Sequence, residues 1–264
     1  MTPTKKFVYA TFPNLAGKRV VVTGGGTGIG AELTSAFVGQ GAQVVFIDIA
    51  REASSALAES LAASLPAGGH MPVFKYCNLM DLDALAATFA NIEQEIGAVE
   101  ILINNAANDD RHQIADVTEK YWNDRMAVNL RHLYFCAKAV APGMKAAGGG
   151  VILNFGSISW HVALPDLSLY MTAKAAIEGM TRGLARDLGR DGTRVNCIIP
   201  GAVSTPRQEQ WTDAEEETRI LAMQVLPQRV QMQDVAALTL FLASDNAAKC
   251  SGREYFVDAG WYGA

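Results

Sequence analysis

The feature that most constrains the fold is a glycine-rich loop between a valine-rich run and a helical pattern. Residues 19–23 read Arg-Val-Val-Val-Thr, residues 24–30 read Gly-Gly-Gly-Thr-Gly-Ile-Gly, and residues 31–40 have helical character. Glycines let the backbone approach a pyrophosphate, and a helix N-terminus offers unpaired N–H groups to its negative charge. A strand, this loop and a helix in that order predict a dinucleotide-binding unit.

The rest of the chain alternates short strand-like runs with longer helical patterns, such as residues 81–96. The runs are apolar on both faces, as strands covered on both sides must be. The alternation predicts an α/β fold over residues 1–264: a single doubly wound (Rossmann) domain with a seven-stranded, mostly parallel sheet and helices on both faces. Residues 1–14 are an N-terminal extension. The expected strands are residues 19–23, 43–48, 72–74, 101–103, 151–155, 194–199 and 254–257.

Composition excludes several classes of protein. The net charge of −5 argues against a nucleic-acid partner, because binding a polyanion calls for a basic excess. No run approaches the ~18 apolar residues of a membrane span, and residues 1–13 lack the apolar segment of a signal peptide. We therefore expect a cytoplasmic protein without a membrane partner. Four widely separated cysteines indicate reduced core thiols and no metal site: Cys77, Cys136, Cys197 and Cys250.

An acidic residue, Asp48, ends the second expected strand twenty residues beyond Gly28. A carboxylate there can accept hydrogen bonds from the two ribose hydroxyls of NAD and would repel a 2′-phosphate. We therefore predict NAD rather than NADP. Two alternatives remain: Asp48 caps the following helix, or Arg51 pairs with the phosphate of NADP.

Four residues form a possible proton-handling set. Tyr170 and Lys174 lie four residues apart, one above the other on a helix face. Ser157 lies thirteen residues upstream, where the fifth strand ends, at the edge where α/β sheets bind ligands. Asn129 falls inside the long helix before that strand. A Tyr-x-x-x-Lys pair alone is more often a surface feature of a helix, but here it follows a dinucleotide loop.

In this order the motifs resemble the short-chain dehydrogenase/reductase family over residues 15 to 260 or so. The general motifs are the loop at 23–30, residues 104–106, Asn129, Ser157, Tyr170 with Lys174, and residues 200–201. Residues 108–112, 154–161 and 257–261 look closest to bacterial NAD-dependent aldose 1-dehydrogenases, those of D-xylose among them. The resemblance implies that the C1 hydroxyl of an aldose (D-xylose or a related pentose or 6-deoxyhexose) is oxidised to the lactone.

The resemblance also implies residue roles. Tyr170 is the general base, helped by the ammonium of Lys174, and Ser157 holds the reacting hydroxyl. Lys174 also contacts the nicotinamide ribose, and Asn129 supports a water that relays the proton. The implied NAD-binding residues are Gly24, Thr27, Gly28, Ile29, Gly30, Asp48, Asn78, Leu79, Asn105, Ala106, Tyr170, Lys174, Pro200, Gly201, Val203 and Thr205.

Two positions depart from the family pattern. Ala107 stands where the family usually has glycine, which is tolerable if its φ is negative. Asn78 stands where an aspartate often meets the adenine amino group, and an amide oxygen can still accept that hydrogen bond.

The sugar needs polar groups and an aromatic platform. Asn108, Trp160 and His161 follow strand ends and are the expected contacts, together with Ser157, Tyr170 and Arg207. A structural role for His161 is equally open. Asp109 and Asp110 suggest paired-carboxylate chemistry, but adjacent residues rarely face each other, so we interpret them as a solvated loop.

Residues 204–226 are expected to form a lid over the active site, although their acidic run at 213–217 also fits a solvated helix. Small residues on the helix at 170–189 fit either sheet packing or a subunit contact, and the resemblance favours a homotetramer. Two other functions stay open: a ketone or ketoacyl reductase (or another sugar-alcohol dehydrogenase) of the same family, and a redox-sensing NAD-binding regulator.

Overall fold

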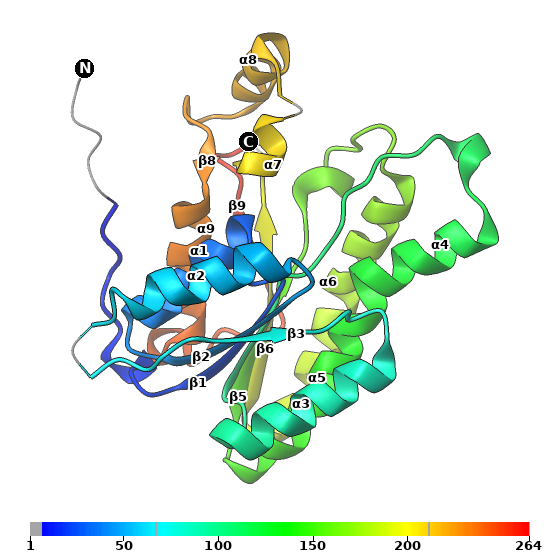
Figure 1. Cartoon of the computed structure of the whole chain (residues 1–264). Coiled ribbons are helices and arrows are strands. Elements are labelled where there is room, and N and C mark those ends of the chain that lie inside the picture. The colour runs from blue at the N-terminus through cyan, green and yellow to red at the C-terminus, as the bar shows by residue number, and fades with distance from the viewer. Residues whose placement is uncertain (1–6, 67, 211, 264) are drawn as a thin grey trace.

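The structure is a computed structural model, and it describes residues 7–66, 68–210 and 212–263. Seven strands form one sheet in the order β3-β2-β1-β4-β5-β6-β9, and every neighbouring pair is parallel. This confirms the predicted doubly wound sheet (Figure 1). The strands are β1 (Arg19–Thr23), β2 (Gln43–Asp48), β3 (Val73–Tyr76), β4 (Ile101–Asn104), β5 (Gly150–Phe155), β6 (Thr193–Pro200) and β9 (Glu254–Val257).

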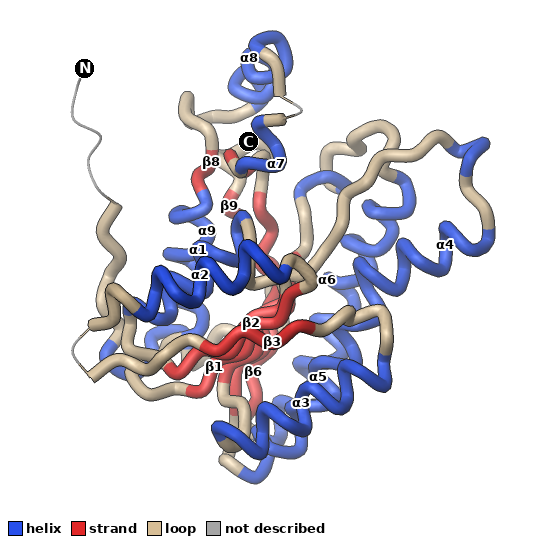
Figure 2. The backbone as a smooth tube through the Cα atoms, viewed as in Figure 1, coloured by secondary structure: helices blue, strands red, loops and turns tan. Residues whose placement is uncertain are grey.

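Helices cover both faces of the sheet (Figure 2). One layer holds α1 (Gly28–Gly39), α2 (Arg51–Ala62) and α9 (Met232–Ala243). The other holds α3 (Leu82–Ile96), α5 (His132–Ala146) and α6 (Ser168–Leu188). The shorter helices are α4 (Glu119–Met126), α7 (Pro206–Glu209) and α8 (Ala214–Met223), and a small second sheet pairs β7 (Val203–Ser204) with β8 (Val230–Gln231).

The position of strand β1 in the sheet explains why apolar and polar residues do not alternate in its sequence. Successive side chains of a strand point to opposite faces. Val20 and Val22 pack in the core under α1 and α9, whereas Val21 packs in the core under α3 and α5. All three are fully buried, so both faces of this central strand need apolar side chains.

The chain changes direction between β1 and β4, which are neighbours in the sheet although two strands lie between them in sequence. Ligands of open α/β sheets bind beyond the carboxyl ends of the strands at such a switch point. The loops that follow β1, β4, β5 and β6 meet there, with α7 and α8 beside them (Figure 1). The topology therefore brings the sequence motifs to one edge.

The described part of the N-terminal extension packs along α1. The Tyr9 hydroxyl donates to the Glu32 carboxylate, and the Phe12 N–H donates to Gln40 Oε1 at 2.8 Å. The four cysteines are free thiols; Cys250 is partly buried and the other three are buried.

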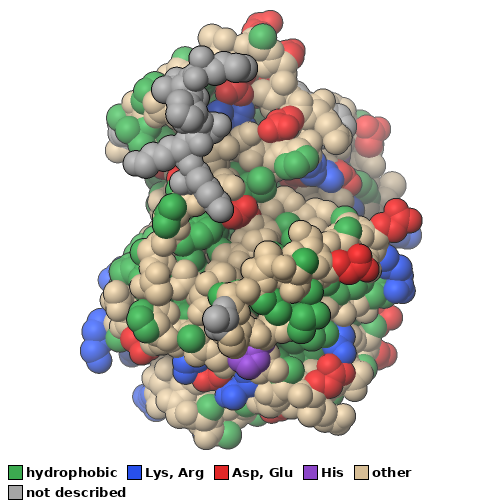
Figure 3. All heavy atoms as spheres, turned by 60° about the vertical axis from the view of Figure 1, so that its left-hand side comes forward, with side chains coloured by type: hydrophobic (Ala, Val, Ile, Leu, Met, Phe, Trp, Pro, Cys, Tyr) green, Lys and Arg blue, Asp and Glu red, His purple; other side chains and the backbone are tan. Residues whose placement is uncertain are grey.

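The surface has mixed charge on the face that Figure 3 shows, where acidic and basic side chains are interspersed. Among the helices of residues 7–66, 68–210 and 212–263, none has the length and apolar character that crossing a bilayer requires.

Candidate active site

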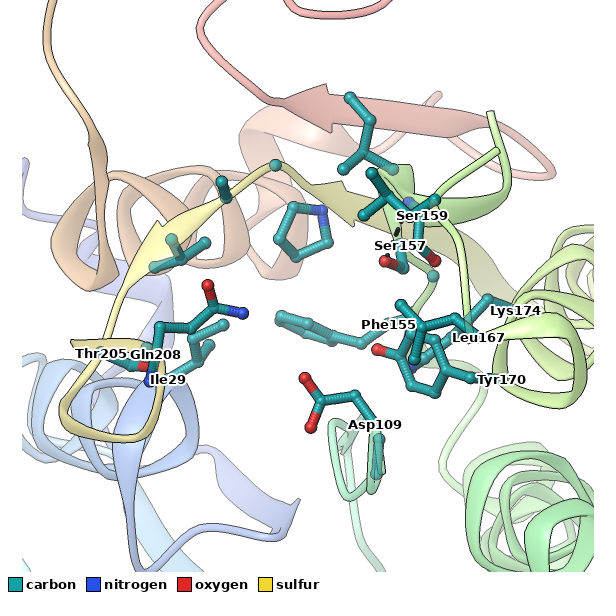
Figure 4. A pocket seen from close by; sticks show the side chains of 18 of the residues that line it. Ile29, Asp109, Phe155, Ser157, Ser159, Leu167, Tyr170, Lys174, Thr205 and Gln208 are labelled. Carbon is teal, nitrogen blue, oxygen red and sulfur yellow. Dashed lines mark hydrogen bonds between the residues drawn. The ribbon is translucent and has the colours of Figure 1, made fainter. Parts of the chain in front are cut away.

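A cavity of about 250 Å³ lies at the carboxyl edge of the sheet (Figure 4). Of the expected catalytic residues, Ser157, Tyr170 and Lys174 line it. The expected cofactor and substrate residues that also line it come from α1, from the loop after β4 and from the segment that runs from the end of β6 into α7. They are Ile29, Asn105, Pro200, Gly201, Val203, Thr205 and Arg207. Three regions far apart in sequence therefore contribute to one cavity.

The glycine loop is shaped to admit a phosphate group. Gly28 has a φ of +54°, and a Cβ added to it would meet nothing within 4 Å. Gly30 has no such room, because its Cβ would lie 1.8 Å from the Gly24 carbonyl oxygen. Thr27 precedes α1 without a side-chain capping bond, so the first N–H groups of the helix stay available for an anion.

Asn105 ties this loop to the end of β4. Its Nδ2 donates to the carbonyl oxygens of Thr23 and Gly24 at 3.1 and 3.0 Å. The backbone N–H groups of Asn105 and Ala106 donate in turn to Thr23 Oγ1. The loop and strand β4 are therefore held as one unit, which fits the pyrophosphate of a dinucleotide.

Asp48 also joins the glycine loop. Its Oδ2 accepts from the Gly26 N–H at 2.8 Å, and its Oδ1 accepts from the N–H groups of Ile49 and Ala50. The residue before α2 is Ala50, so Asp48 is not its N-cap. Arg51 does not pair with this carboxylate; its guanidinium stacks on Tyr76, with Cζ 3.4 Å from the ring centroid.

The adenine side of the expected site follows β3. Asn78 is exposed, and its Oδ1 accepts from the Met80 N–H at 3.1 Å. Leu79 is buried in the core under α3 and α5. Together with Gly24, Thr27, Gly28, Gly30, Asp48 and Ala106, they lie outside the lining of the cavity described above.

Lys174 is buried one turn below Tyr170 on α6. Its Nζ donates to the Phe155 carbonyl oxygen at 2.7 Å and lies 5.3 Å from the centroid of the Tyr170 ring. Burial disfavours the ammonium and lowers the pKa of Lys174 to about 8. The pair has the spacing that the sequence predicts, but the ammonium is bonded to the backbone rather than to the phenol.

The protein groups around Tyr170 favour its neutral form. Burial raises the pKa of the phenol, and the negative charge of Asp109 raises it further. Hydrogen bonding with Ser157 and the positive charge of Arg207 lower it. The sequence-based expectation that the Lys174 ammonium lowers this pKa stays a prediction; Lys174 Nζ donates to the Phe155 carbonyl and lies 5.3 Å from the centroid of the Tyr170 ring.

Asn129 lies in a π-helical turn, Ala127–Arg131, between α4 and α5, and its side chain is fully buried. Its Oδ1 accepts from the Asn108 N–H at 2.8 Å, and its Nδ2 donates to the Asn108 carbonyl at 2.9 Å. Such turns are frequent at functional sites. Here the amide fixes the loop after β4 and does not itself line the cavity.

Asn108 turns the chain rather than lining the cavity. Its Oδ1 accepts from the Asp110 N–H at 2.8 Å, and the intervening Asp109 points into the cavity (Figure 4). The solvated-loop interpretation therefore misses Asp109, because a turn lets two adjacent side chains diverge. The signal was present in the family-like stretch 108–112, which contains both acids.

Trp160 and His161 lie outside the residues that line the cavity. The Trp160 Nε1 donates to Glu178 Oε1 at 2.7 Å, and His161 Nε2 lies 2.9 Å from the same oxygen. His161 also packs against Phe256 and Tyr262. This placement gives no support to their expected contact with substrate and supports the structural interpretation of His161.

A different tryptophan, Trp261, lines the cavity. It is 8% exposed, and its Nε1 is buried without a hydrogen-bond partner in the described part of the chain. An indole in this position offers an apolar face and one donor. It belongs to the family-like ending 257–261, but its position in the cavity depends on how the chain turns after β9.

Residues 204–226 border the cavity through α7 and α8. Thr205 caps α7, and Arg207 and Gln208 face the cavity from it. In the acidic run, Asp213 caps α8, Glu216 lines the cavity and Glu217 pairs with Arg229. The position fits the expected lid; its movement stays a prediction.

A family model described as enoyl-(acyl carrier protein) reductase matches residues 24–262. A D-xylose 1-dehydrogenase of Caulobacter vibrioides is 59% identical over 253 residues, which cover 96% of this chain and 98% of that protein. A short-chain type dehydrogenase/reductase from Mycobacterium ulcerans superposes with a TM-score of 0.89 at 25% identity, over 96% of this chain and 91% of that chain. This chain belongs to the short-chain dehydrogenase/reductase family.

Two other relatives of this dehydrogenase/reductase carry names that state a substrate or a bound ligand. "Probable galactose dehydrogenase GalD" of Rhizobium meliloti is 44% identical, over 94% of this chain and 96% of that protein. A 7α-hydroxysteroid dehydrogenase complexed with NADH and 7-oxo glycochenodeoxycholic acid has a TM-score of 0.88 and 31% identity, over 94% of this chain and 96% of that chain. Dehydrogenases of this family use nicotinamide cofactors on small-molecule substrates.

The departure at Ala107 is explained by the backbone. Outside glycine, the described residues with positive φ are Ala163, Asp166 and Ala259. Ala107 therefore has an ordinary backbone conformation, which confirms that a methyl group is tolerated there.

Proposed function

We propose that this protein oxidises the C1 hydroxyl of an aldose, D-xylose or a related pentose or 6-deoxyhexose, to the lactone with NAD. The observation that carries the reaction type is the meeting of Tyr170, Ser157 and Lys174 in one cavity beside the glycine loop. The substrate class rests on the 59% identity with a D-xylose 1-dehydrogenase.

The walls of the cavity suit a sugar. Asp109 and Gln208 offer hydrogen-bonding groups, and Leu167 and Trp261 contribute apolar surface. A sugar ring needs both, because its hydroxyls form a polar rim and its C–H groups form an apolar face. Closure of the cavity over a bound sugar would exclude water from hydride transfer.

The chain's own residues divide the work. Ser157 holds the reacting hydroxyl against Tyr170, and Tyr170 takes its proton as general base. Lys174 would hold the nicotinamide ribose. A bound oxidised nicotinamide would supply the hydride acceptor for C1 and a positive charge that favours the phenolate. Asn129 supports the set by fixing the loop after β4.

The glycine loop, Asn105 and the turn at Pro200 and Gly201 are the groups that would hold the cofactor. Asp48 favours NAD, since its carboxylate faces the loop and Arg51 is stacked on Tyr76. A kcat/KM for NADP comparable with that for NAD would contradict this choice.

The decisive experiment follows the absorbance at 340 nm with NAD and a panel of D-xylose, L-arabinose, D-glucose, D-galactose and L-fucose. We expect turnover with at least one pentose and release of its lactone. The second candidate is a ketone or ketoacyl reductase, which the reductase description of the matched family model favours. Oxidation of NADH by ketones, with no turnover of any aldose, would establish that alternative.

We also propose a cytoplasmic homotetramer that uses the outer face of α6. Ala176, Gly179 and Gly183 are exposed, and a Cβ added to either glycine would meet nothing within 4 Å. These small residues do not pack on the sheet, so a second helix could approach them closely. Sedimentation at micromolar concentration tests this; a monomer mass would refute it.

A further inference from the structure

Two adjacent carboxylates share one arginine at the mouth of the cavity. Arg207 Nη2, on α7, lies 3.0 Å from Asp109 Oδ1 and 2.9 Å from Asp110 Oδ1. Asp110 has a second partner, Arg125 Nη1, at 3.1 Å. Asp109 lines the cavity and Asp110 does not, so the two acids share a partner but differ in what they face.

The direction of Asp109 is fixed by the turn around it. Asn129 holds both backbone polar groups of Asn108, and the Asn108 side chain accepts from the Asp110 N–H. These bonds span residues on both sides of Asp109. Its side chain is 38% exposed, and its ion pair with Arg207 is its one polar contact among the described residues. The carboxylate therefore keeps acceptor capacity for a ligand.

Asp109 faces the same part of the cavity as the reacting groups. In Figure 4 its carboxylate, the Tyr170 hydroxyl and the Gln208 amide point toward the centre of the pocket. Its charge raises the pKa of both Tyr170 and Lys174, which places it within electrostatic reach of each. A sugar whose C1 hydroxyl meets Tyr170 would thus bring other ring hydroxyls toward Asp109.

We propose that Asp109 is a specificity-determining residue that accepts a hydrogen bond from a ring hydroxyl of the sugar other than the reacting one. Arg207 is a positioning residue that holds the Asp109 carboxylate toward the cavity. The inference rests on the proposed aldose oxidation and names the group that recognises the sugar. A charged acceptor gives strong discrimination, because a ligand without the matching hydroxyl leaves it unpaired.

The test compares D109N with D110N, since both remove a carboxylate from Arg207 and only Asp109 lines the cavity. With the aldose that the wild type turns over fastest, we expect D109N to lower kcat/KM about 10- to 100-fold, mainly through KM. D110N should stay within about threefold of wild type, as a partly exposed ion pair contributes little. Binding of NADH, followed by its fluorescence, should be unchanged in both; D109S is the second variant if D109N does not fold.

Monodeoxy analogues of the same aldose identify the contact. For the analogue that lacks the contacted hydroxyl, the kcat/KM of the wild type should fall relative to the parent aldose. The kcat/KM of D109N should hardly differ between the two sugars, because D109N has already lost that hydrogen bond. R207A should raise KM with less effect on kcat, and R207K should recover part of the loss.

Three results would overturn the proposal. Equal losses in D109N and D110N would mean that Asp109 only ties α7 to the loop. If the loss of kcat/KM from D109N and the loss from removing a hydroxyl multiplied for every deoxy analogue, a direct contact between Asp109 and a hydroxyl would be excluded. If the wild type turns over no aldose, the proposed function itself fails and this inference with it, a result that the first assay separates from the other two.

Discussion

At the residue scale, the chemistry depends on how the protein balances charge around one phenol. Burial and Asp109 keep the pKa of Tyr170 above its ordinary value, while Ser157 and Arg207 act in the opposite direction. Lys174 is bonded to the Phe155 carbonyl, so its ammonium is close to the ring without contacting the phenol oxygen. In the proposed reaction, a bound oxidised cofactor would add positive charge that favours the phenolate.

Replacing Tyr170 by phenylalanine should abolish turnover and spare cofactor binding. The phenol is the proton acceptor of the proposed reaction, and general-base catalysis is typically worth about 10²–10⁴ in rate. Steady-state kinetics and NADH fluorescence separate the two effects. Tyr134→Phe, a half-exposed tyrosine on α5, is the matched control. A Y170F enzyme that kept more than about a tenth of wild-type kcat would rule out Tyr170 as the base.

The pH profile should respond to Asp109. Turnover needs the phenolate, so activity falls as the pH drops through the pKa of Tyr170. Asp109 raises that pKa, and D109N should therefore move the acidic limb of kcat/KM to lower pH, whereas D110N should not. The other charged groups that face the phenol are Lys174 on α6 and Arg207 on α7; the same cavity also contains Arg111, Glu216 and Arg219. A shift of the limb to higher pH would contradict this account.

At the scale of elements, the strands were predictable because buried parallel strands are apolar on both faces. Strands β1, β2 and β9 match the predicted residue ranges, and the others differ by one or two residues at their ends. Side-chain direction after a strand end was not predictable. Trp160 and His161 turn toward Glu178, which lies on α6 eighteen and seventeen residues away, respectively, and no local sequence pattern predicts that contact. The sequence analysis also missed that Asp109 faces the cavity. Its direction depends on a turn in which the Asn108 side chain accepts from the Asp110 N–H.

The π-helical turn offers a test of how an element positions the site. Asn129→Ala removes both hydrogen bonds to the Asn108 backbone and leaves its polar groups unpaired. We expect a loss of about 1–3 kcal/mol in the free energy of unfolding and a rise in sugar KM, as the loop that directs Asp109 loosens. Thermal unfolding and kinetics measure the two, with the exposed Asn123→Ala on α4 as control. Unchanged KM with reduced stability would confine Asn129 to a structural role.

At the scale of the whole molecule, residues from the first helix and from the segment after the last strand line the same cavity. Ile29 enters from the first helix, and Trp261 enters four residues beyond the last strand. The Ala259 carbonyl accepts from the N–H groups of Val225 and Leu226, so the C-terminal segment also braces the end of the expected lid. The cavity is complete only when the segment that follows β9 has folded against it.

This arrangement predicts that Trp261→Ala weakens both folding and substrate binding. Trp261 packs in the cluster with Leu133, Ile158 and Ile220, and truncating a buried tryptophan typically costs about 3–5 kcal/mol. Sugar KM should rise because the cavity loses an apolar wall and a buried donor. Tyr262→Ala is the control: its ring is half-exposed and packs on His161 and Phe256, outside the cavity, so stability should fall slightly and KM should hold. If W261A lowered Tm but left KM unchanged, Trp261 would support the fold without contacting the sugar, and Asp109 would have to bind it without this aromatic wall.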